Sequence, residues 1–301
     1  MTRHLAAASL GLLAVVGSVH VPAYAQKAGD LAKVEAALPD KAPATPKAPR
    51  NILLFTGSGP GGFRHGSIPI GTRAITLMGD KTKAYTAFAT EDVSYFEPEK
   101  LAKFDAVFML NTTGNCLRPK AGDKAAQDAR EEVLKKSLES FVASGKGLIG
   151  VHAATDTYGG WKAYNKMMGG AFDGHPWNAG GKVGVKNLDP THPINAAFDG
   201  AGFEITDEIY QFRVDTAKKG ERRYLLALDG DKTNLKIGKR ADGFYPISWV
   251  STYEKGRNFY CSLGHNDAIY WNPAVLRHYL AGIQYALGDL EIDATPQADP
   301  K

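Results

Sequence analysis

The sequence predicts an α/β protein with a doubly wound, mostly parallel sheet. From residue 50 onward, short apolar runs alternate with amphipathic segments, as the strands and crossover helices of such a sheet do. The run Gly147–Val151 is apolar throughout, which is typical of a strand that is buried on both faces and therefore central. Residues 160–245 are richer in glycine, proline and aromatic residues, which indicates a large insertion of irregular or antiparallel structure. We therefore expect one domain over residues 50–289.

The first half of this domain is expected to supply the parallel strands. Strands are predicted at 51–56, 84–89, 104–110 and 147–151, and helices at 68–78 and 123–144. The last of these helices carries apolar residues at helical spacing and stops at Gly145, a residue that favours the end of a helix.

The second half begins with short strands and ends with a helix. Strands are predicted near 183–187 and 224–228 and then at 246–250 and 257–263, followed by a closing helix over 273–287. Pro273 stands at the first position of that helix, where proline is tolerated.

Residues 1–25 have the pattern of a secretory signal peptide. A basic start precedes an apolar run, and Ala23-Tyr24-Ala25 forms a small-x-small cleavage site before Gln26. The apolar run is nearly long enough to span a bilayer, so an uncleaved anchor is the alternative. We expect cleavage near Ala25 and a periplasmic or secreted protein that does not contact the membrane afterwards.

Two further segments flank the predicted domain. Residues 26–49 are rich in alanine, lysine and proline, which indicates a linker that is extended apart from a short helix over 30–38. Residues 290–301 are expected to form a C-terminal tail.

The composition limits the choice of partners. The chain has 36 Lys and Arg residues against 32 Asp and Glu residues, and this near balance does not suggest the clustered basic face that nucleic acid requires. Cys116 and Cys261 could pair after export, but the apolar surroundings of Cys261 favour a buried free thiol. The oligomeric state is not indicated by the sequence.

Three histidines follow predicted strands at their carboxyl ends. His65 lies in the loop after the first strand, His152 directly after the fourth, and His265 after the last. Because an open parallel sheet binds ligands outside the carboxyl ends of its strands, we expect these imidazoles to face one site. Further candidates for that site are Asp156, Glu208 and Asp267.

Two kinds of chemistry fit such a set of residues. Neutral imidazoles and a carboxylate can form a catalytic metal site with an open position for water. The ligands would then include His65, His152 and His265, and the metal would be zinc, manganese or calcium. Alternatively, histidine and carboxylate act as base and acid on a sugar without a metal. The catalytic residues in either case are His152, Glu208 and His265.

The glycine-rich segment TGSGPGGFRHGS, residues 56–67, does not indicate a nucleotide cofactor. It lacks the G-x-G-x-x-G pattern of dinucleotide sites and the lysine of a phosphate-binding loop. Its glycines would instead let the backbone approach a ligand, with the side chain of Arg64 beside it.

Aromatic residues in the second half favour a small carbohydrate as the ligand. Sugar rings stack their C–H faces on aromatic side chains while their hydroxyls bond to polar groups. Trp177 and Trp271, each close to a candidate histidine, are the residues we expect to contact the sugar, together with Arg64, Asp156 and Asp267.

Several of these segments resemble the ThuA-like, trehalose-utilisation family. The motifs that carry the resemblance are FRHGS (63–67), GLIGVHAATDT (147–157), MGGAFDGHP (168–176), THPI (191–194), ITDEIYQF (205–212), PISW (246–249) and GRNFYCSLGHND (256–267). The resemblance covers about residues 50–289. It implies a flavodoxin-like fold of the class I glutamine amidotransferase type.

One departure from the amidotransferases bears on the chemistry. Their nucleophile lies in a G-x-C-x-G turn, whereas this chain reads Gly150-Val151-His152-Ala153-Ala154. Histidine replaces the cysteine, so glutamine hydrolysis through a thiolate is excluded. We expect the sharp turn itself to persist.

The resemblance also implies a role in carbohydrate catabolism. We expect an exported hydrolase or lyase that acts on a disaccharide, a glycoside or a keto-sugar derived from one. By motif, the site residues are His65, His152, His175, Glu208 and His265, and His175 would join the other three histidines as a ligand of the metal. His192 in THPI is expected in a turn. The alternative is a carbohydrate-binding protein that has the fold of an enzyme but no activity.

Overall fold

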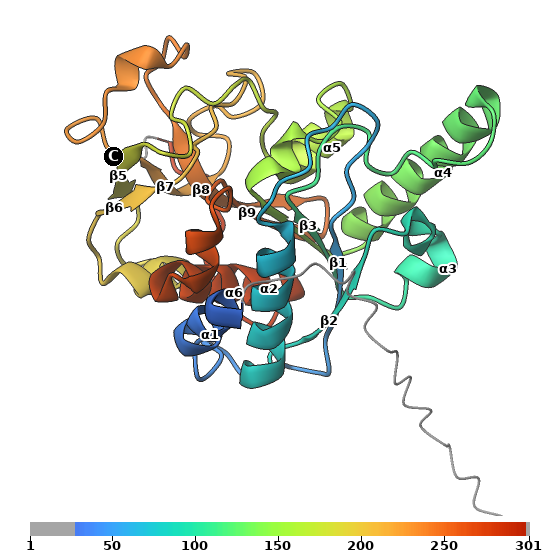
Figure 1. The fold of residues 1–301 in the computed structure, drawn as a ribbon, viewed down its shortest axis with the longest axis horizontal. Helices are drawn as coiled ribbons and strands as arrows, with labels where there is room; N and C mark the ends of the chain where they lie inside the picture. Colours follow the sequence, from blue (N-terminus) through green and yellow to red (C-terminus); the bar gives the residue numbers. More distant parts are fainter. Residues whose placement is uncertain (1–27, 299–301) are drawn as a thin grey trace, which may run out of the picture.

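The computed structural model describes residues 28–298 and contains the expected doubly wound sheet (Figure 1). The sheet has nine strands in the order β2-β1-β3-β4-β9-β8-β7-β5-β6. The first five of these are parallel: β2 (Thr86–Thr90), β1 (Asn51–Phe55), β3 (Ala106–Leu110), β4 (Gly147–Val151) and β9 (Gly256–Cys261). The remaining four are antiparallel: β8 (Pro246–Tyr253), β7 (Arg223–Leu228), β5 (Lys182–Asn187) and β6 (Phe203–Thr206).

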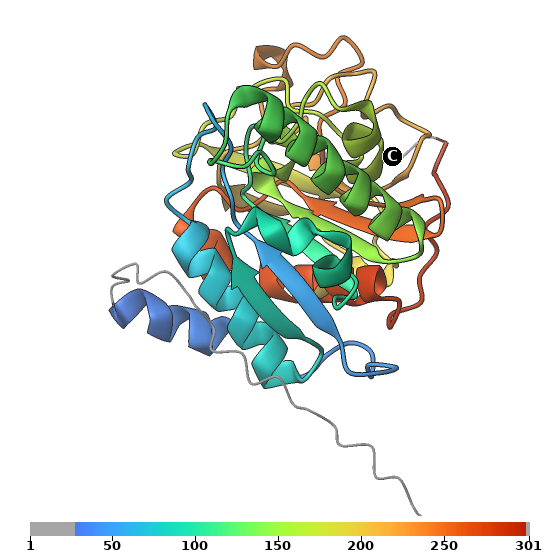
Figure 2. The same cartoon turned by 90° about the vertical axis from the view of Figure 1, so that its right-hand side faces the viewer.

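Helices cover both faces of the parallel half. On one face lie α1 (Ala28–Ala37), α2 (Ile68–Thr82) and α6 (Pro273–Leu287), and on the other α3 (Pro98–Leu101), α4 (Lys124–Ala143) and α5 (Lys162–Met168). In Figure 2, α4 lies in front of the sheet and α2 on its other side. Short 3-10 helices lie at 93–96, 152–156, 193–198, 235–237 and 267–271.

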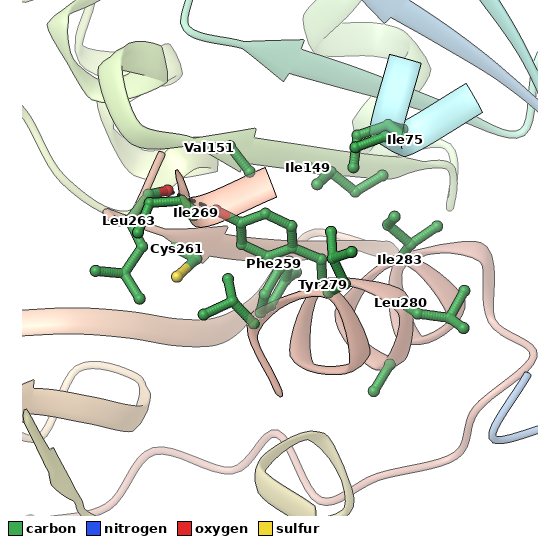
Figure 3. Packing of buried hydrophobic residues seen from close by; sticks show 14 of the residues in the cluster. Ile75, Ile149, Val151, Phe259, Cys261, Leu263, Ile269, Tyr279, Leu280 and Ile283 are labelled. Carbon is green, nitrogen blue, oxygen red and sulfur yellow. Dashed lines mark hydrogen bonds between the residues drawn. The ribbon is translucent and has the colours of Figure 1, made fainter. Parts of the chain in front are cut away.

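The alternation of side chains along β4 shows why this strand had to be apolar throughout. Leu148 packs with α4 and α5, while Ile149 points to the opposite face, towards α2 and α6. Figure 3 shows Ile149 beside Phe259 of β9 and Ile283 of α6. Burying one such side chain contributes about 1.5–3 kcal/mol, so both layers hold the central strands in place.

The N-terminal segment contains the expected short helix, but it packs on the domain and is not a free extended linker. Residues 28–37 form α1, and Val34 on this helix is fully buried in the core. The following residues stay against the domain because the backbone of Ala44 exchanges two hydrogen bonds with the Gln284 side chain and Arg50 pairs with Asp289 at 2.6 Å. We call residues 28–50 the N-terminal strap. The buried apolar residues of the strap, Val34, Ala37 and Leu38, pack against the domain although lysine and proline dominate the surrounding sequence.

The C-terminal segment also packs on the domain further than expected. Leu290 and Ile292 pack against the core, and Asp293 pairs with Arg223 at 2.5 Å. The predicted signal peptide lies outside the described residues. Within residues 28–298, no helix has the length and hydropathy needed to cross a membrane.

The two cysteines do not pair. Cys116 packs on the α4 face of the sheet and Cys261 on the α6 face, and both are buried free thiols. Burial raises the pKa of Cys261 to about 12, so this thiol stays protonated and inert.

Candidate functional site

The three expected histidines meet at the carboxyl edge of the parallel strands. His65 follows β1, His152 follows β4 and His265 follows β9, and the ring centroids lie 4.9–5.2 Å apart. Glu208, two residues after β6, joins them from the antiparallel half of the sheet. One ligand atom from each of the four residues lies within 4.8 Å of the others. We call these four residues the His3Glu cluster.

His152 is held in a sharp turn at the end of β4. Its φ is 49°, in the left-handed region that is uncommon for a residue with a side chain. A Cβ on Gly150 would meet the end of the Met168 side chain, which would have to shift, so the approach to this turn is closely packed. The expected elbow geometry is therefore present, with an imidazole in place of the thiol. Such backbone strain is typical of functional sites.

The orientation of the His152 ring is fixed by a backbone carbonyl. Nδ1 lies 2.8 Å from the Ser262 carbonyl oxygen, which can only accept a hydrogen bond. Nδ1 therefore carries the hydrogen, and Nε2 presents its lone pair to the cluster. Histidines that bind metals are usually oriented in this way by a second group.

His265 is positioned by the carboxylate of Asp207. Oδ2 of Asp207 accepts the N–H groups of Gly264 at 2.7 Å and His265 at 3.3 Å, and Oδ1 accepts that of Asn266 at 2.8 Å. Burial raises the pKa of Asp207, although these hydrogen bonds and His152 oppose the shift. Asp207 thus holds the His265 loop and does not face the cluster as a ligand.

Asn111 connects the loops that carry His65 and His265. Its Nδ2 donates to Ser67 Oγ at 2.9 Å and to the Gly264 carbonyl at 3.0 Å. The same carbonyl accepts from Ser67 Oγ at 2.9 Å and from the Tyr270 hydroxyl at 3.0 Å. These hydrogen bonds fix the separation between the loop that carries His65 and the loop that carries His265.

His65 is a neutral imidazole in this environment. Burial, together with the charges of His152 and His265, lowers the pKa of His65 to about 3. Its Nδ1 is buried and has no hydrogen-bond partner. A buried nitrogen without a partner is costly unless another group, such as an ion, satisfies it.

Glu208 supplies the negative charge of the cluster. Its Oε2 lies 3.1 Å from His265 Nδ1 and 3.5 Å from His152 Nε2. Burial favours the protonated form, but the nearby imidazoles of His152 and His265 outweigh it and lower the pKa of Glu208. The bond to Glu208 is also the main reason why the pKa of His265 is raised. The carboxylate therefore attracts positive charge to the centre of the cluster.

Three of the donor separations fit a tetrahedral metal. His152 Nε2 and His265 Nδ1 lie 3.2 Å apart, and Oε2 of Glu208 completes a triangle with the 3.1 and 3.5 Å sides given above. Ligands about 2.0–2.1 Å from a tetrahedral zinc lie about 3.3–3.4 Å from one another. Imidazole and carboxylate together suit zinc or manganese, whereas calcium prefers oxygen ligands alone. The residues present therefore fit a metal, and calcium is the least suitable of the three expected ions.

Aromatic side chains and one carboxyl group surround the cluster. The ring of Tyr210 lies 4.4 Å from that of His152 at a tilt of 40°, and Phe172 packs on Tyr210. Phe63 lies edge-on to His65 at 4.8 Å and is 63% exposed. Asp156 is half-buried, and this burial raises its pKa to about 6. These groups form the surroundings in which a bound molecule would be held.

The model of the ThuA family, described as trehalose utilisation, matches residues 51–286. The chain belongs to the ThuA family. No match is found among curated proteins.

Solved structures of ThuA-like proteins share the fold. A putative ThuA-like protein from Bacteroides uniformis is 22% identical with a TM-score of 0.60, and the match covers 80% of this chain and 93% of that one. A second, from Parabacteroides merdae, is 16% identical with a TM-score of 0.55, covering 84% and 99% of the two chains. At these identities the likeness shows the fold alone.

His175 occupies a different place in this ThuA protein from the one expected. Its side chain is half exposed, and its Nδ1 lies 3.2 Å from Oε1 of Glu208. Glu208, which was expected to act as an acid or base, is the fourth member of the cluster. His175 is not a member of the cluster and contacts only its Glu208 side chain. His192 caps the 3-10 helix at 193–198, as expected for a turn residue.

Trp177 and Trp271 do not lie where a sugar would contact them at the cluster. Trp177 is buried in the core, where its ring packs against Tyr245 and its N–H donates to the Asn234 carbonyl. Trp271 packs against the core beneath Lys33 of α1. The aromatic residues that do surround the cluster, Phe63, Phe172 and Tyr210, were not singled out by the sequence.

The remaining expected residues lie at the edge of the site. Arg64 pairs with Glu91 at 2.5 Å, next to His65 in sequence. Asp267 is mostly exposed. The partial burial of its carboxyl group, together with the nearby charge of Asp30 of α1, raises the pKa of Asp267. Asn111 and Ser67 could have been noticed as polar residues that end a buried strand or begin a helix, although their mutual contact spans 44 residues.

Proposed function

We propose that this ThuA protein is an exported, metal-dependent enzyme of carbohydrate breakdown, a hydrolase or lyase that acts on a glycoside or on a keto-sugar derived from one. The His3Glu cluster is the observation that carries the proposal. His65, His152, His265 and Glu208 would hold the ion, with zinc the best fit and manganese the second.

A metal in such a site supplies a Lewis acid or an activated water at neutral pH. The chain's own groups complete the chemistry. His152 keeps its lone pair on the cluster because Nδ1 is bonded to Ser262, and Glu208 provides compensating charge. Asp156, with a pKa of about 6, can exchange a proton with a substrate near neutral pH.

The family supports a carbohydrate as the substrate, since its model is described as trehalose utilisation. The surroundings of the cluster agree with this, because aromatic rings and the polar carboxyl group of Asp156 lie around it. A sugar presents C–H faces to the first and hydroxyls to the second.

The test measures metal content and turnover in the same preparation of the full chain. We expect nearly one zinc or manganese ion per chain by elemental analysis, turnover of disaccharides or 3-keto-disaccharides, and loss of turnover with a chelator. His152→Ala should lose both metal and turnover, by more than the roughly 10–100-fold that changes around a metal site cause. The intact mass shows whether the exported chain begins at Gln26.

His192→Asn is the matched control, because His192 is a buried histidine outside the cluster and asparagine also caps helices. It should retain metal and activity. A metal-free wild-type protein with full activity, or an active His152→Ala, contradicts the proposal. The second candidate is a carbohydrate-binding protein without activity, because His152 replaces the nucleophilic cysteine at the elbow. Thermal stabilisation of the protein by a sugar, without formation of any product, would support this candidate instead.

A further inference from the structure

A cavity lies next to the loop that carries His65, at the point where the strand order of the sheet reverses. From β1 the chain passes to β2 on one side and then to β3 on the other. The loops that follow these strands enclose a cavity of about 500 Å³, lined in part by Gly57–Pro60, Glu91–Val93 and Arg118–Ala121. Doubly wound sheets bind ligands in the crevice at this position, and ligand pockets have volumes of about 300–1,000 Å³.

The walls of this cavity are preformed. A Cβ on Gly59 would collide with the backbone of Asn115, so the two loops touch there and only glycine fits. Arg118 is held at 2.6 Å by both Asp128 and Glu131. Asp92 is held by the N–H and hydroxyl of Ser94, each at 2.9 Å. A ligand would therefore meet polar groups that are already oriented, which reduces the entropy lost on binding.

The charges that line the cavity favour a neutral, hydroxyl-rich ligand. Glu91 and Asp92 would repel an anion, while Arg118 and Lys120 would repel a cation. Hydroxyl groups can donate to the carboxylates and accept from the guanidinium and ammonium groups. A sugar unit satisfies both kinds of group.

The cavity and the cluster share one loop. Its outgoing part, Gly57–Pro60, lines the cavity, and its returning part carries His65. The two parts are tied together because the Phe63 carbonyl accepts hydrogen bonds from Thr113 Oγ1 at 2.7 Å and from Ser58 Oγ at 3.5 Å. Arg64, beside His65, pairs with Glu91 of the cavity wall. A molecule that extends past this loop could therefore occupy both places.

We propose that this cavity is a subsite for the second sugar unit of the substrate. The reacting unit lies at the His3Glu cluster, and the unit beyond it enters the cavity between the loops after β1, β2 and β3. The inference rests on the proposed function, and it narrows the substrate class to saccharides of at least two units.

The test compares a disaccharide with a single sugar unit. Binding of α,α-trehalose, maltose and cellobiose, and of the methyl α- and β-glucosides, is measured by calorimetry on the full chain. Wild type should bind at least one of the disaccharides about 10-fold or more tightly than the methyl glucosides. Ala121→Trp, which fills the cavity from an exposed loop position, should remove this difference.

Ala125→Trp is the matched control, because Ala125 is an exposed alanine four residues further along that does not line the cavity. It should bind like wild type. Lys120→Ala, a change without added bulk, should weaken the disaccharide by a few-fold and leave the methyl glucosides unchanged. Equal affinity of wild type for both kinds of sugar, no binding of any probe, or an unchanged preference in Ala121→Trp overturns the proposal.

His152→Ala separates the failure of this inference from that of the proposed function. If the cluster is not a metal centre but the subsite exists, His152→Ala keeps metal content and turnover unchanged while Ala121→Trp still removes the preference for disaccharides. If the cluster is the metal centre but the subsite is wrong, His152→Ala loses metal and Ala121→Trp has no selective effect.

Discussion

The parallel and antiparallel halves of the sheet contribute different atoms to the site. Strands β1, β4 and β9 of the parallel half bring the three imidazoles, each placed by the end of a buried strand. The antiparallel half brings the carboxylates of Asp207 and Glu208, which follow its outermost strand, β6. The cluster therefore exists only when both halves are assembled. Each half alone would present either nitrogen ligands or the charge that a cation requires.

This difference makes Asp207 the residue outside the cluster whose change should have the largest effect. Its carboxylate joins the halves by accepting three N–H groups from the loop after β9. In Asp207→Asn an amide N–H₂ would face donors, so we expect a loss of about 3 kcal/mol in the free energy of unfolding. Metal affinity should fall by about 10–100-fold, as for other changes behind a metal ligand.

Denaturant titration and metal-binding titration on the same variant check this expectation. Asp173→Asn, an exposed aspartate in the neighbouring loop, serves as the control and should change neither quantity. Loss of stability without any loss of metal affinity would mean that the position of His265 does not depend on Asp207.

A smaller, pH-dependent effect is expected where α6 meets the antiparallel half. His278 is fully buried, with Nε2 at 2.8 Å from Ser248 Oγ of β8 and Nδ1 at 3.0 Å from the Ile194 carbonyl. Burial lowers its pKa to about 3 from the ordinary 6.5. The folded state therefore binds its proton less readily than the unfolded state. The stability that neutral His278 contributes is present above pH 6.5 and is lost as the pH falls towards 3.

Between pH 7 and pH 5 this loss should amount to about 2 kcal/mol in the free energy of unfolding. His278→Asn should be less stable at pH 7 but should lack this part of the pH dependence. Urea unfolding at both pH values measures it. Parallel stability curves for the two proteins would show that His278 does not carry the effect.

The smallest effect is expected at the helix cap that begins α6. Asn272 caps this helix because its Oδ1 accepts from the N–H groups of Ala274 at 3.0 Å and Val275 at 3.2 Å. Asn272→Ala should lower the free energy of unfolding by about 1 kcal/mol, while Asn272→Asp should retain most of it. Metal content should not change, since no residue of the cluster depends on this cap. Thermal unfolding and elemental analysis check both points.

The two halves also differed in how far the sequence predicted them. In the parallel half, strands such as Gly147–Val151 are continuous apolar runs, and the carboxyl-end rule brought His65, His152 and His265 together correctly. In the antiparallel half, β6 is four residues long and half exposed, so it left little pattern to detect. That Glu208 completes the cluster depends on contacts across the sheet, which residue spacing does not contain.

The aromatic residues show a second reason for the misses. Trp177 and Trp271 follow candidate histidines by two and six residues in the sequence, but both pack into or against the core. Phe63 stands in a glycine-rich loop without helical or strand periodicity, and only the fold brings it over His65. The number of aromatic residues in the sequence indicated that some would line a site. Which of their side chains face the cluster depends on tertiary packing, which the sequence did not reveal.

The N-terminal strap has a practical consequence for anyone who shortens the gene. The family match, residues 51–286, begins one residue after Arg50 and ends before Asp289, so a recombinant fragment cut at these limits would lose both members of that ion pair. It would also strip Val34 and Ala44 from α6 and the surrounding core, leaving the polar side chain of Gln284 without its partners. The unit that folds is therefore larger than residues 51–286, which the family model matches.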